Sequence, residues 1–327
     1  MHIVITGGLG FIGSNFIKHI LSETRDLFIT NIDAETYAAG LDNLKDLKDK
    51  KNYQYFKGSI QDYDFIEGII KRYKPDCIIN FAAETHVDRS IHSAQPFIDT
   101  NIVGTHVLLE AALKQGLNKY IQISTDEVYG SIEPPHKFHE ESPIKPNSPY
   151  SASKAGADHL VMAYRETYGL NGLIIRCSNN FGPYQFPEKV IPYFISLAME
   201  DKKVPVYGDG LNVRDWIYVS DFCSAIRLVL EKGKTGEVYN VGGNCELNNL
   251  QLTKAVLKKL NKSESLIDFV KDRPGHDRRY AMDSTKIQKE LGWKKKYNFE
   301  EALDKTISWY KNNREWVKRR TKQFAAI

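Results

Sequence analysis

Three glycines near the start of the chain, Gly7, Gly10 and Gly13, most strongly constrain its fold. They follow an apolar run at residues 2–6, typical of a buried parallel strand, and precede an amphipathic stretch at residues 14–21, typical of a helix. Glycines at this spacing permit a tight turn, close approach of the backbone to a pyrophosphate, and close helix packing. The pattern predicts a dinucleotide-binding unit at this end of the chain.

A second predicted strand, residues 27–33, ends in a carboxylate, Asp33, 20 residues after Gly13. A carboxylate there can accept hydrogen bonds from both ribose hydroxyls of adenosine and repels a 2′-phosphate. We therefore expect NAD as the cofactor rather than NADP. An ordinary exposed Asp at a strand end is the alternative, and the preceding glycines argue against it.

Further apolar runs alternate with amphipathic stretches along the chain. We expect strands at residues 53–58 and 77–83 and helices at 62–73 and 101–115. Strands that alternate with helices at this spacing predict an α/β fold with a Rossmann-type doubly wound parallel sheet. In such sheets ligands bind beyond the carboxyl ends of the strands. The second half of the chain predicts a smaller α/β C-terminal substrate domain.

Two groups of polar residues carry the clearest chemical signal. Thr125, Asp126 and Glu127 stand at the end of a predicted strand, where polar groups belong to a site more often than to a core; capping of the next turn is the alternative. Tyr150 and Lys154 lie one turn apart on one face of a predicted helix. We expect the ammonium to stabilise the phenolate, lowering the tyrosine pKa, so that the tyrosine can take the proton of a sugar hydroxyl. A Tyr-x-x-x-Lys pair alone is more often a solvated surface pair.

Charge and cysteine content exclude several classes of function. The net charge of the 327-residue chain is only +4, from 45 basic and 41 acidic interspersed residues, which argues against nucleic acid and membrane partners. Cys77, Cys177, Cys223 and Cys245 lack the spacing of a zinc site or a disulfide framework, and no other metal site is indicated. We expect reduced thiols in a cytoplasmic protein without a signal peptide or a membrane span.

Together, the glycine turn, Asp33, the residues from Thr125 to Glu127 and the Tyr150/Lys154 pair resemble the extended short-chain dehydrogenase/reductase family. Within it the chain is most similar to 4,6-dehydratases of nucleotide sugars, because 4-epimerases typically lack the adjacent Asp and Glu. Three further segments look like the substrate-binding parts of those enzymes: residues 177–189, 214–221 and 272–280.

The resemblance implies a reaction and a role for each polar residue. The enzyme would oxidise C4 of a hexose, eliminate water across C5 and C6, and return the hydride to C6. Tyr150 would remove the C4 hydroxyl proton, Lys154 would hold the phenolate and a ribose hydroxyl, and Thr125 would hydrogen-bond the C4 oxygen. Glu127 would take the C5 proton and Asp126 would protonate the departing C6 hydroxyl. Adjacent carboxylates raise each other's proton affinity, which helps to sustain one acid and one base.

The resemblance also implies two sets of binding residues. The cofactor side comprises Gly7, Gly10, Phe11, Ile12, Gly13, Asp33, Tyr37, Ser59, Ile60, Phe81, Ala82, Ala83, Thr85, Thr100, Tyr150, Lys154, Cys177 and Asn180. The substrate side comprises Thr85, His86, Asn179, Glu188, Lys189, Val190, Pro205, Tyr207, Arg214, Asn249, Arg273, His276 and Tyr280. Arg214 and Arg273 would bind the diphosphate, since guanidinium forks suit phosphate oxygens. dTDP-glucose is the favoured substrate, in deoxysugar (rhamnose-type) biosynthesis.

The expected NAD-binding domain comprises residues 1–178 plus about 215–241. The nucleotide-sugar-binding domain comprises about 179–214 plus 242–316, and the tail 317–327, which matches nothing in the family, is expected to be frayed. The resemblance further implies a homodimer, in which the helices beginning near Asn101 and Tyr150 form a four-helix bundle with a second copy.

Three alternatives stay open at this point. They are a UDP-glucose or other nucleotide-sugar 4,6-dehydratase, a 4-epimerase, and an inactive NAD-binding sensor. The chain also departs from the family pattern at four positions. Ala34 and Ser59 concern the cofactor side, whereas Phe222 and Cys245 are expected to touch the substrate side.

Overall fold

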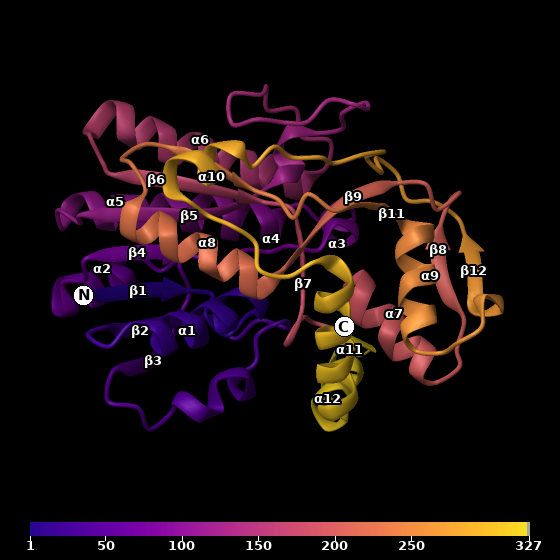
Figure 1. Ribbon diagram of the computed structural model, residues 1–327. Coiled ribbons are helices and arrows are strands. Elements are labelled where there is room, and N and C mark those ends of the chain that lie inside the picture. The colour runs from indigo at the N-terminus through magenta and orange to yellow at the C-terminus, as the bar shows by residue number, and fades with distance from the viewer. Residues whose placement is uncertain (326–327) are drawn as a thin grey trace.

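The computed structural model describes residues 1–325 and is built around a seven-stranded sheet (Figure 1). The strand order is β10-β6-β5-β4-β1-β2-β3, and every pairing is parallel. The strands are β1 (His2–Thr6), β2 (Phe28–Asp33), β3 (Tyr53–Lys57), β4 (Cys77–Asn80), β5 (Lys119–Thr125), β6 (Gly172–Cys177) and β10 (Val238–Val241). The predicted doubly wound sheet is confirmed. Its strand order reverses between β1 and β4, where ligands of such sheets bind.

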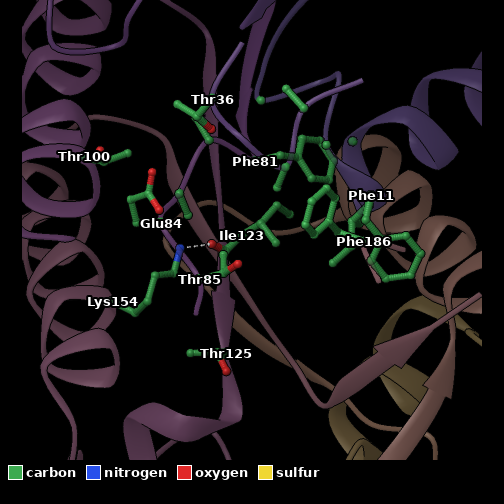
Figure 2. Close-up of a pocket in the computed structure, with 18 of the residues that line it drawn as sticks. Phe11, Thr36, Phe81, Glu84, Thr85, Thr100, Ile123, Thr125, Lys154 and Phe186 are labelled. Carbon is green, nitrogen blue, oxygen red and sulfur yellow. Dashed lines mark hydrogen bonds between the residues drawn. The ribbon is translucent and has the colours of Figure 1, made fainter. Parts of the chain in front are cut away.

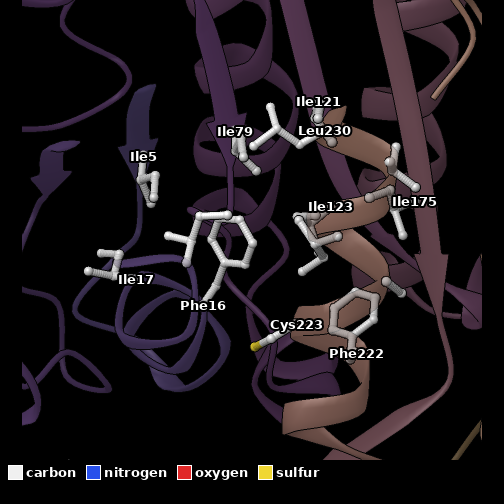
Figure 3. Packing of buried hydrophobic residues seen from close by; sticks show 14 of the residues in the cluster. Ile5, Phe16, Ile17, Ile79, Ile121, Ile123, Ile175, Phe222, Cys223 and Leu230 are labelled. Carbon is white, nitrogen blue, oxygen red and sulfur yellow. The ribbon is translucent and has the colours of Figure 1, made fainter. Parts of the chain in front are cut away.

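Helices cover both faces of this sheet. One face carries α1 (Phe11–Glu23), α8 (Val219–Lys232) and α10 (Thr285–Leu291), and the other carries α2 (Tyr63–Tyr73), α5 (Gly104–Lys114) and α6 (Pro149–Tyr168). Successive side chains of a strand point to opposite faces of the sheet. Ile3 and Ile5 therefore pack with α1 and α8, whereas Val4 packs with α2 and α5 on the other face. In Figure 3, Phe16 and Phe222 fill the space between the first layer and the sheet.

Short elements follow the carboxyl ends of the central strands. They are η1 (Leu41–Leu47), α3 (Val87–His92), α4 (Gln95–Phe97), the π-helical η2 (Ile98–Val103) and η3 (Asp126–Tyr129). The helix predicted at residues 101–115 therefore begins with a π-helical turn. The buried Asn101 side chain in this turn donates to the Glu84 carbonyl at 3.0 Å and to Ser153 Oγ at 2.8 Å. It thereby fixes the segment after β4 to helix α6.

A smaller unit lies beyond the carboxyl ends of the large sheet (Figure 1). Its sheets have the orders β11-β9-β7 and β12-β8. The strands are β7 (Asn179–Phe181), β8 (Val204–Tyr207), β9 (Val213–Tyr218), β11 (Glu246–Asn248) and β12 (Ile267–Val270), and the helices are α7 (Val190–Met199), α9 (Asn249–Lys259), η4 (Glu264–Leu266) and α11 (Phe299–Asn312). Its own core includes Phe194, Trp216, Leu252, Leu303 and Tyr310. The smaller α/β unit is confirmed, and the domain boundaries stay a prediction.

Two expectations for the second half of the chain are wrong. Residues 216–218, which were expected in the NAD-binding domain as part of residues 215–241, belong to β9, which pairs with β7 and β11; from that range, α8 and β10 rejoin the large sheet. The tail is not frayed over residues 317–325, which form most of α12 (Arg314–Ala325); residues 326 and 327 lie outside the described part of the chain. Arg319 pairs with Asp42, 277 positions away, and a contact of this range leaves no local trace in the sequence.

Helix α6, which carries Tyr150 and Lys154, is fixed at its start and along its length. Ser148 and Ser151 form a capping box around Pro149 at the first helical position. Further along, Asp158 accepts a hydrogen bond from Arg176 Nε of β6 at 2.9 Å. Their side chains are 0% and 2% exposed. This pair holds α6 against the sheet.

We predict that Asp158→Ala lowers the free energy of unfolding by about 3–5 kcal/mol, because it leaves the Arg176 guanidinium buried without its counter-charge. Urea unfolding followed by circular dichroism measures this loss. The control is Glu166→Ala, whose ion pair with Arg165 is exposed and whose removal should change stability by less than about 1 kcal/mol. Similar small effects of both substitutions would contradict the role given to the buried pair.

Candidate functional site

A cavity of about 420 Å³ lies at the carboxyl ends of the central strands and extends to the start of the smaller unit (Figure 2). Most residues predicted for the cofactor or for catalysis line it: Gly7, Gly10, Phe11, Ile12, Gly13, Asp33, Ser59, Ile60, Phe81, Ala82, Ala83, Thr85, Thr100, Thr125, Asp126, Glu127, Tyr150, Lys154, Cys177 and Asn180. Tyr37 lies outside the lining, and its hydroxyl donates to Glu188 Oε1 at 2.8 Å. The fold thus brings residues from distant parts of the chain to one site.

The glycine turn is shaped by close backbone contacts. Gly7 has a φ of +70°, and a Cβ atom there would lie 2.5 Å from Ala82 N. A Cβ atom on Gly13 would lie 2.5 Å from Gly7 O. Helix α1 begins after Gly10 without a side-chain cap and without an acidic residue in its first turn. The first N–H groups and the positive end of the helix dipole therefore suit a pyrophosphate.

The predicted ribose carboxylate, Asp33, lies buried at the end of β2. It accepts the backbone N–H groups of Leu9 and Glu35, both at 2.9 Å. Burial raises the pKa of Asp33, and these two hydrogen bonds oppose that shift. Each carboxylate oxygen keeps a further lone pair, so Asp33 can still accept ribose hydroxyls. Nearby, Ile60 and Phe81 give the cavity apolar walls that suit flat rings.

Thr125 ends β5, and Asp126 and Glu127 open η3 directly at the cavity. The Thr125 hydroxyl caps η3, because it accepts the N–H of Glu127 at 3.3 Å. Capping therefore does not account for the two carboxylates. Asp126 is 2% exposed, and its Oδ2 atom has no hydrogen-bond partner among the described residues. A buried polar atom without a partner at a cavity is typical of a group that meets a ligand.

The two carboxyl groups differ in their charged neighbours. Burial raises the pKa of Asp126 well above its usual value, and the negative charges of Glu127 and Asp215 raise it further. The positive charge of Arg214 and a hydrogen bond from Thr125 oppose this rise in pKa. Burial also raises the pKa of Glu127, but the positive charges of three basic residues, led by Arg214, oppose this. Asp126 is therefore the better proton donor and Glu127 the better proton acceptor.

Tyr150 and Lys154 lie at the start of α6 and are both buried beside the cavity. Lys154 Nζ donates to the Ile123 carbonyl at 2.7 Å (Figure 2). The prediction that the lysine lowers the tyrosine pKa is wrong here, because burial raises the pKa of Tyr150 well above its usual value and the charge of Glu127 adds to the shift. Burial lowers the pKa of Lys154.

The residues predicted for the nucleotide sugar fall into two groups. Thr85, Asn179, Glu188 and Lys189 line the cavity. The others lie outside its lining: His86, Val190, Pro205, Tyr207, Arg214, Asn249, Arg273, His276 and Tyr280. Arg214 and Arg273 nevertheless lower the proton affinity of Glu127, so their charges act on a group that lines the cavity.

Contacts within the protein already hold both of these arginines. Arg214 lies over the Tyr280 ring at 4.1 Å, and its Nη2 donates to the Asp277 carbonyl at 3.0 Å. Arg273 Nη1 pairs with the Asp88 carboxylate at 3.1 Å, and its Nε atom is buried without a partner among the described residues. Because Asp88 belongs to α3, this ion pair joins the smaller unit to the large one. A diphosphate would compete with Asp88 for the Arg273 guanidinium.

Side chains from two other parts of the chain surround the Glu188 carboxylate. Its Oε1 accepts the Tyr37 hydroxyl, while His86 Nε2 and Arg89 Nη2 lie 3.8 and 3.9 Å from its Oε2. The Arg89 guanidinium also lies 3.9 Å from the centre of the Tyr37 ring. Sequence reasoning missed Arg89, although it stands close behind the fourth predicted strand. This cluster orients the Glu188 carboxylate at the cavity wall.

Further lining residues were not predicted: Ile32, Thr36, Ala38, Ala39, Gly58, Gln61, Glu84, Ile123, Ser124, Ser178, Gln185 and Phe186. Ser124 Oγ and Gln185 Oε1 are buried without partners among the described residues, which marks them as further ligand-facing groups. Ser124 is the first of the consecutive polar residues that the sequence indicates at this strand end, although no role was assigned to it. Gln185 and Phe186 lie on a loop after β7, where periodicity gives no signal.

The four departures from the family pattern have different surroundings. Ala34 and Ser59 line the cavity, and the Ser59 hydroxyl accepts the N–H of Gln61 at 3.1 Å. The N–H of Cys245 donates to the buried Asp215 at 2.6 Å. Phe222 is fully buried between α8 and the sheet, so the expectation that it touches the substrate side is wrong.

The described residues contain no cluster of three or more His, Cys, Asp or Glu side chains placed to hold a metal ion. In the same part of the chain, every helix is too short or too polar to cross a membrane. All four cysteines are free thiols.

Comparison with known proteins places the chain among relatives of similar length. The family model described as GDP-mannose 4,6 dehydratase matches residues 4–306. The chain is 47% identical to a dTDP-glucose 4,6-dehydratase of Xanthomonas campestris pv. campestris (strain B100), over 96% of this chain and 94% of that protein. It is 50% identical to the low-salt glycan biosynthesis protein Agl12 of Haloferax volcanii, over 95% of this chain and 98% of that protein.

Solved structures agree with this placement. A dTDP-glucose 4,6-dehydratase from Bacillus anthracis, in complex with NAD, matches with a TM-score of 0.93 and 48% identity, over 98% of this chain and 99% of that one. DesIV, a dTDP-glucose 4,6-dehydratase from Streptomyces venezuelae with NAD bound, matches with a TM-score of 0.95 and 42% identity, over 98% of this chain and 100% of that one. The predicted resemblance is confirmed: the chain belongs to the GDP-mannose 4,6 dehydratase family, within the extended short-chain dehydrogenases/reductases.

Proposed function

We propose that the chain is an NAD-dependent dTDP-glucose 4,6-dehydratase, which converts dTDP-glucose to dTDP-4-keto-6-deoxyglucose and water in deoxysugar (rhamnose-type) biosynthesis. The observation that carries the proposal is the Asp126/Glu127 pair beside Thr125, Tyr150 and Lys154 at one cavity. A 4-epimerase needs no acid and base beyond those of C4 oxidation, whereas an elimination across C5 and C6 needs both. Relatives with this activity in their names support the same choice.

The glycine turn and Asp33 support NAD as the cofactor. In this proposal the amide groups at the start of α1 bind the pyrophosphate, and Asp33 accepts the adenosine ribose hydroxyls and repels a 2′-phosphate. Lys154 holds a ribose hydroxyl on the nicotinamide side. Bound NAD would supply the hydride acceptor for C4 and the hydride donor for C6, together with a positive charge that favours a buried phenolate.

The chain's own side chains then handle three protons. Tyr150 takes the proton of the C4 hydroxyl, whose oxygen Thr125 holds by a hydrogen bond. The new ketone acidifies the C5 proton, which Glu127 removes and gives back to C5 when the hydride returns to C6. Asp126 gives its proton to the departing C6 hydroxyl, which leaves as water. The raised pKa of Asp126 and the cations that oppose the shift at Glu127 support this assignment.

The smaller unit would bind the nucleotide diphosphate through Arg214 and Arg273, and Asn179, Lys189 and Asn249 would contact the sugar nucleotide. A UDP-glucose 4,6-dehydratase would use the same catalytic residues, and the names of the relatives favour dTDP. The free cysteines fit a reducing compartment, and we place the activity in the cytoplasm.

A homodimer is part of the proposal, with α5 and α6 forming a four-helix bundle with their counterparts in a second copy. Helices α5 and α6 pack against each other on one face of the sheet. Ile98 and Val103 of η2 and Tyr168 at the end of α6 are exposed apolar side chains in this region. Packing against a second copy of the chain would remove these apolar side chains from water, which is favourable.

For the dimer, sedimentation velocity at micromolar concentration should give twice the mass of 37.4 kDa. Val103→Glu should shift the protein toward the monomer, because a charge would enter the apolar interface. Phe269→Glu on β12 is the matched control, since Phe269 is also exposed but lies on the smaller unit, and it should leave the dimer intact. A wild-type monomer would remove this part of the proposal.

For the elimination, Glu127→Gln keeps the shape of the side chain and removes its basicity, while Tyr150 and Lys154 still permit C4 oxidation. In a single turnover with dTDP-glucose, the absorbance of reduced cofactor at about 340 nm should rise and persist. Formation of the 4-keto-6-deoxy sugar should slow by about a hundredfold to ten-thousandfold, as for loss of a general base.

The matched control for this test is Tyr150→Phe, which blocks the first proton transfer and should give almost no rise in absorbance. If Glu127→Gln makes the 6-deoxy product at nearly the wild-type rate, Glu127 is not the C5 base and the assignment of the carboxyl pair is wrong.

A further inference from the structure

The C-terminal helix α12 connects the smaller unit to the nucleotide-binding side of the molecule. It follows α11, and Figure 1 shows the two helices adjacent to each other. Trp316, near its start, is buried in an aromatic group with Trp309, Tyr310 and Tyr184 of the smaller unit. From this anchor, the next turn of α12 reaches the segment between β2 and β3.

Two arginines of α12 bind that segment. Arg319 Nη2 and Arg320 Nη2 pair with the two carboxylate oxygens of Asp42 at 2.7 and 2.6 Å. Arg320 Nη1 also donates to the Ala39 carbonyl at 2.8 Å. Ala39 lines the cavity, and so does Ala38 before it. Arg320 is only 11% exposed, whereas Arg319 is 61% exposed, so Arg320 makes the better-shielded contact.

A chain of hydrogen bonds continues from α12 into the cofactor turn. Trp316 Nε1 donates to Asn43 Oδ1 at 3.0 Å, and Asn43 Nδ2 donates to the Leu9 carbonyl at 2.9 Å. The N–H of Gly40 donates to the same carbonyl at 3.0 Å. The N–H of Leu9 in turn donates to Asp33 Oδ2 at 2.9 Å. These linked hydrogen bonds run from Trp316 of the C-terminal helix to Asp33, the carboxylate proposed to bind the adenosine ribose.

We propose that α12 is part of the cofactor site, with Arg320 and Trp316 as positioning residues that hold residues 39–43, and through them Leu9 and Asp33, in the geometry that retains the adenosine half of NAD. This inference rests on the proposed NAD-dependent function. A cofactor that is regenerated in each turnover has no need to leave while substrate and product exchange, so tight retention costs the reaction nothing. Contacts between α12 and residues 39–43, which form when the protein folds, can slow the dissociation of NAD without contacting the substrate.

A purely structural role for α12 makes a different prediction. If the helix only covers apolar surface, loss of its polar contacts lowers stability and leaves the affinity for NAD unchanged in the folded protein. A positioning role instead changes NAD affinity and its dissociation rate, and leaves kcat and the KM for dTDP-glucose unchanged once NAD is saturating.

The test uses full-length Arg320→Met, with NAD binding measured by calorimetry after the bound cofactor has been removed and NAD release measured by dilution. We expect the dissociation constant for NAD to rise about tenfold, as for the loss of a shielded charge-assisted hydrogen bond. Trp316→Phe keeps the aromatic packing and removes only the indole donor, so a smaller increase is expected. Lys318→Met is the matched control, because Lys318 is on the same helix, is 70% exposed and, among the described residues, forms an ion pair only with Glu315 at 3.9 Å.

Equal NAD affinity in Arg320→Met and the wild type would overturn the inference, and so would an equal loss in Lys318→Met. Arg320→Lys, which keeps the charge but loses the fork that reaches both Ala39 and Asp42, should fall between Arg320→Met and the wild type. A wild-type protein that binds no NAD would overturn the proposed function instead. Thermal unfolding at saturating NAD shows that each variant is folded when affinity is measured.

Discussion

One buried guanidinium, that of Arg176, connects the segment that carries Tyr150 to the segment that carries the Asp126/Glu127 pair. Its Nε pairs with Asp158 of α6 at 2.9 Å, and its Nη1 donates to the Tyr129 hydroxyl of η3 at 2.8 Å. Helix α6 presents Tyr150 at its N-terminal end, and η3 begins at Asp126. Arg176 and Asp158 are both buried, so losing either one would leave an uncompensated charge away from water. Arg176 therefore fixes helix α6 and η3 relative to each other.

The acid and base roles at the site depend on both units of the molecule. The large unit supplies the burial and the neighbouring carboxylate that raise the pKa of Asp126. The smaller unit supplies cations, Arg214 and Arg273, that oppose the same shift at Glu127. Arg273 is also paired with Asp88 of α3, so the contact between the units and the proton affinity of Glu127 are coupled through one side chain.

Features that depend on local pattern could be predicted from the sequence. The glycine turn, Asp33, the parallel sheet and the polar run from Thr125 to Glu127 at a strand end follow from spacing and periodicity, whereas the roles of that run come from the family resemblance. The glycine turn, Asp33 and the polar run all line one cavity. Features that depend on distant contacts could not. The helical tail is held by an ion pair between Arg320 and the distant Asp42, and β9 joins the smaller unit because it pairs with β7 and β11. The pKa of Tyr150 is raised by burial, which arises only once the whole site has assembled.

The central claim is that one bound cofactor moves a hydride from C4 to C6 of the same sugar. The most direct measurement uses dTDP-glucose carrying deuterium at C4, with the product analysed by proton NMR and mass spectrometry. Our account predicts a 4-keto-6-deoxy product that has lost one water and carries the deuterium in its C6 methyl group. A product that retains the C6 hydroxyl and carries the deuterium at C4 would contradict it and indicate an epimerase.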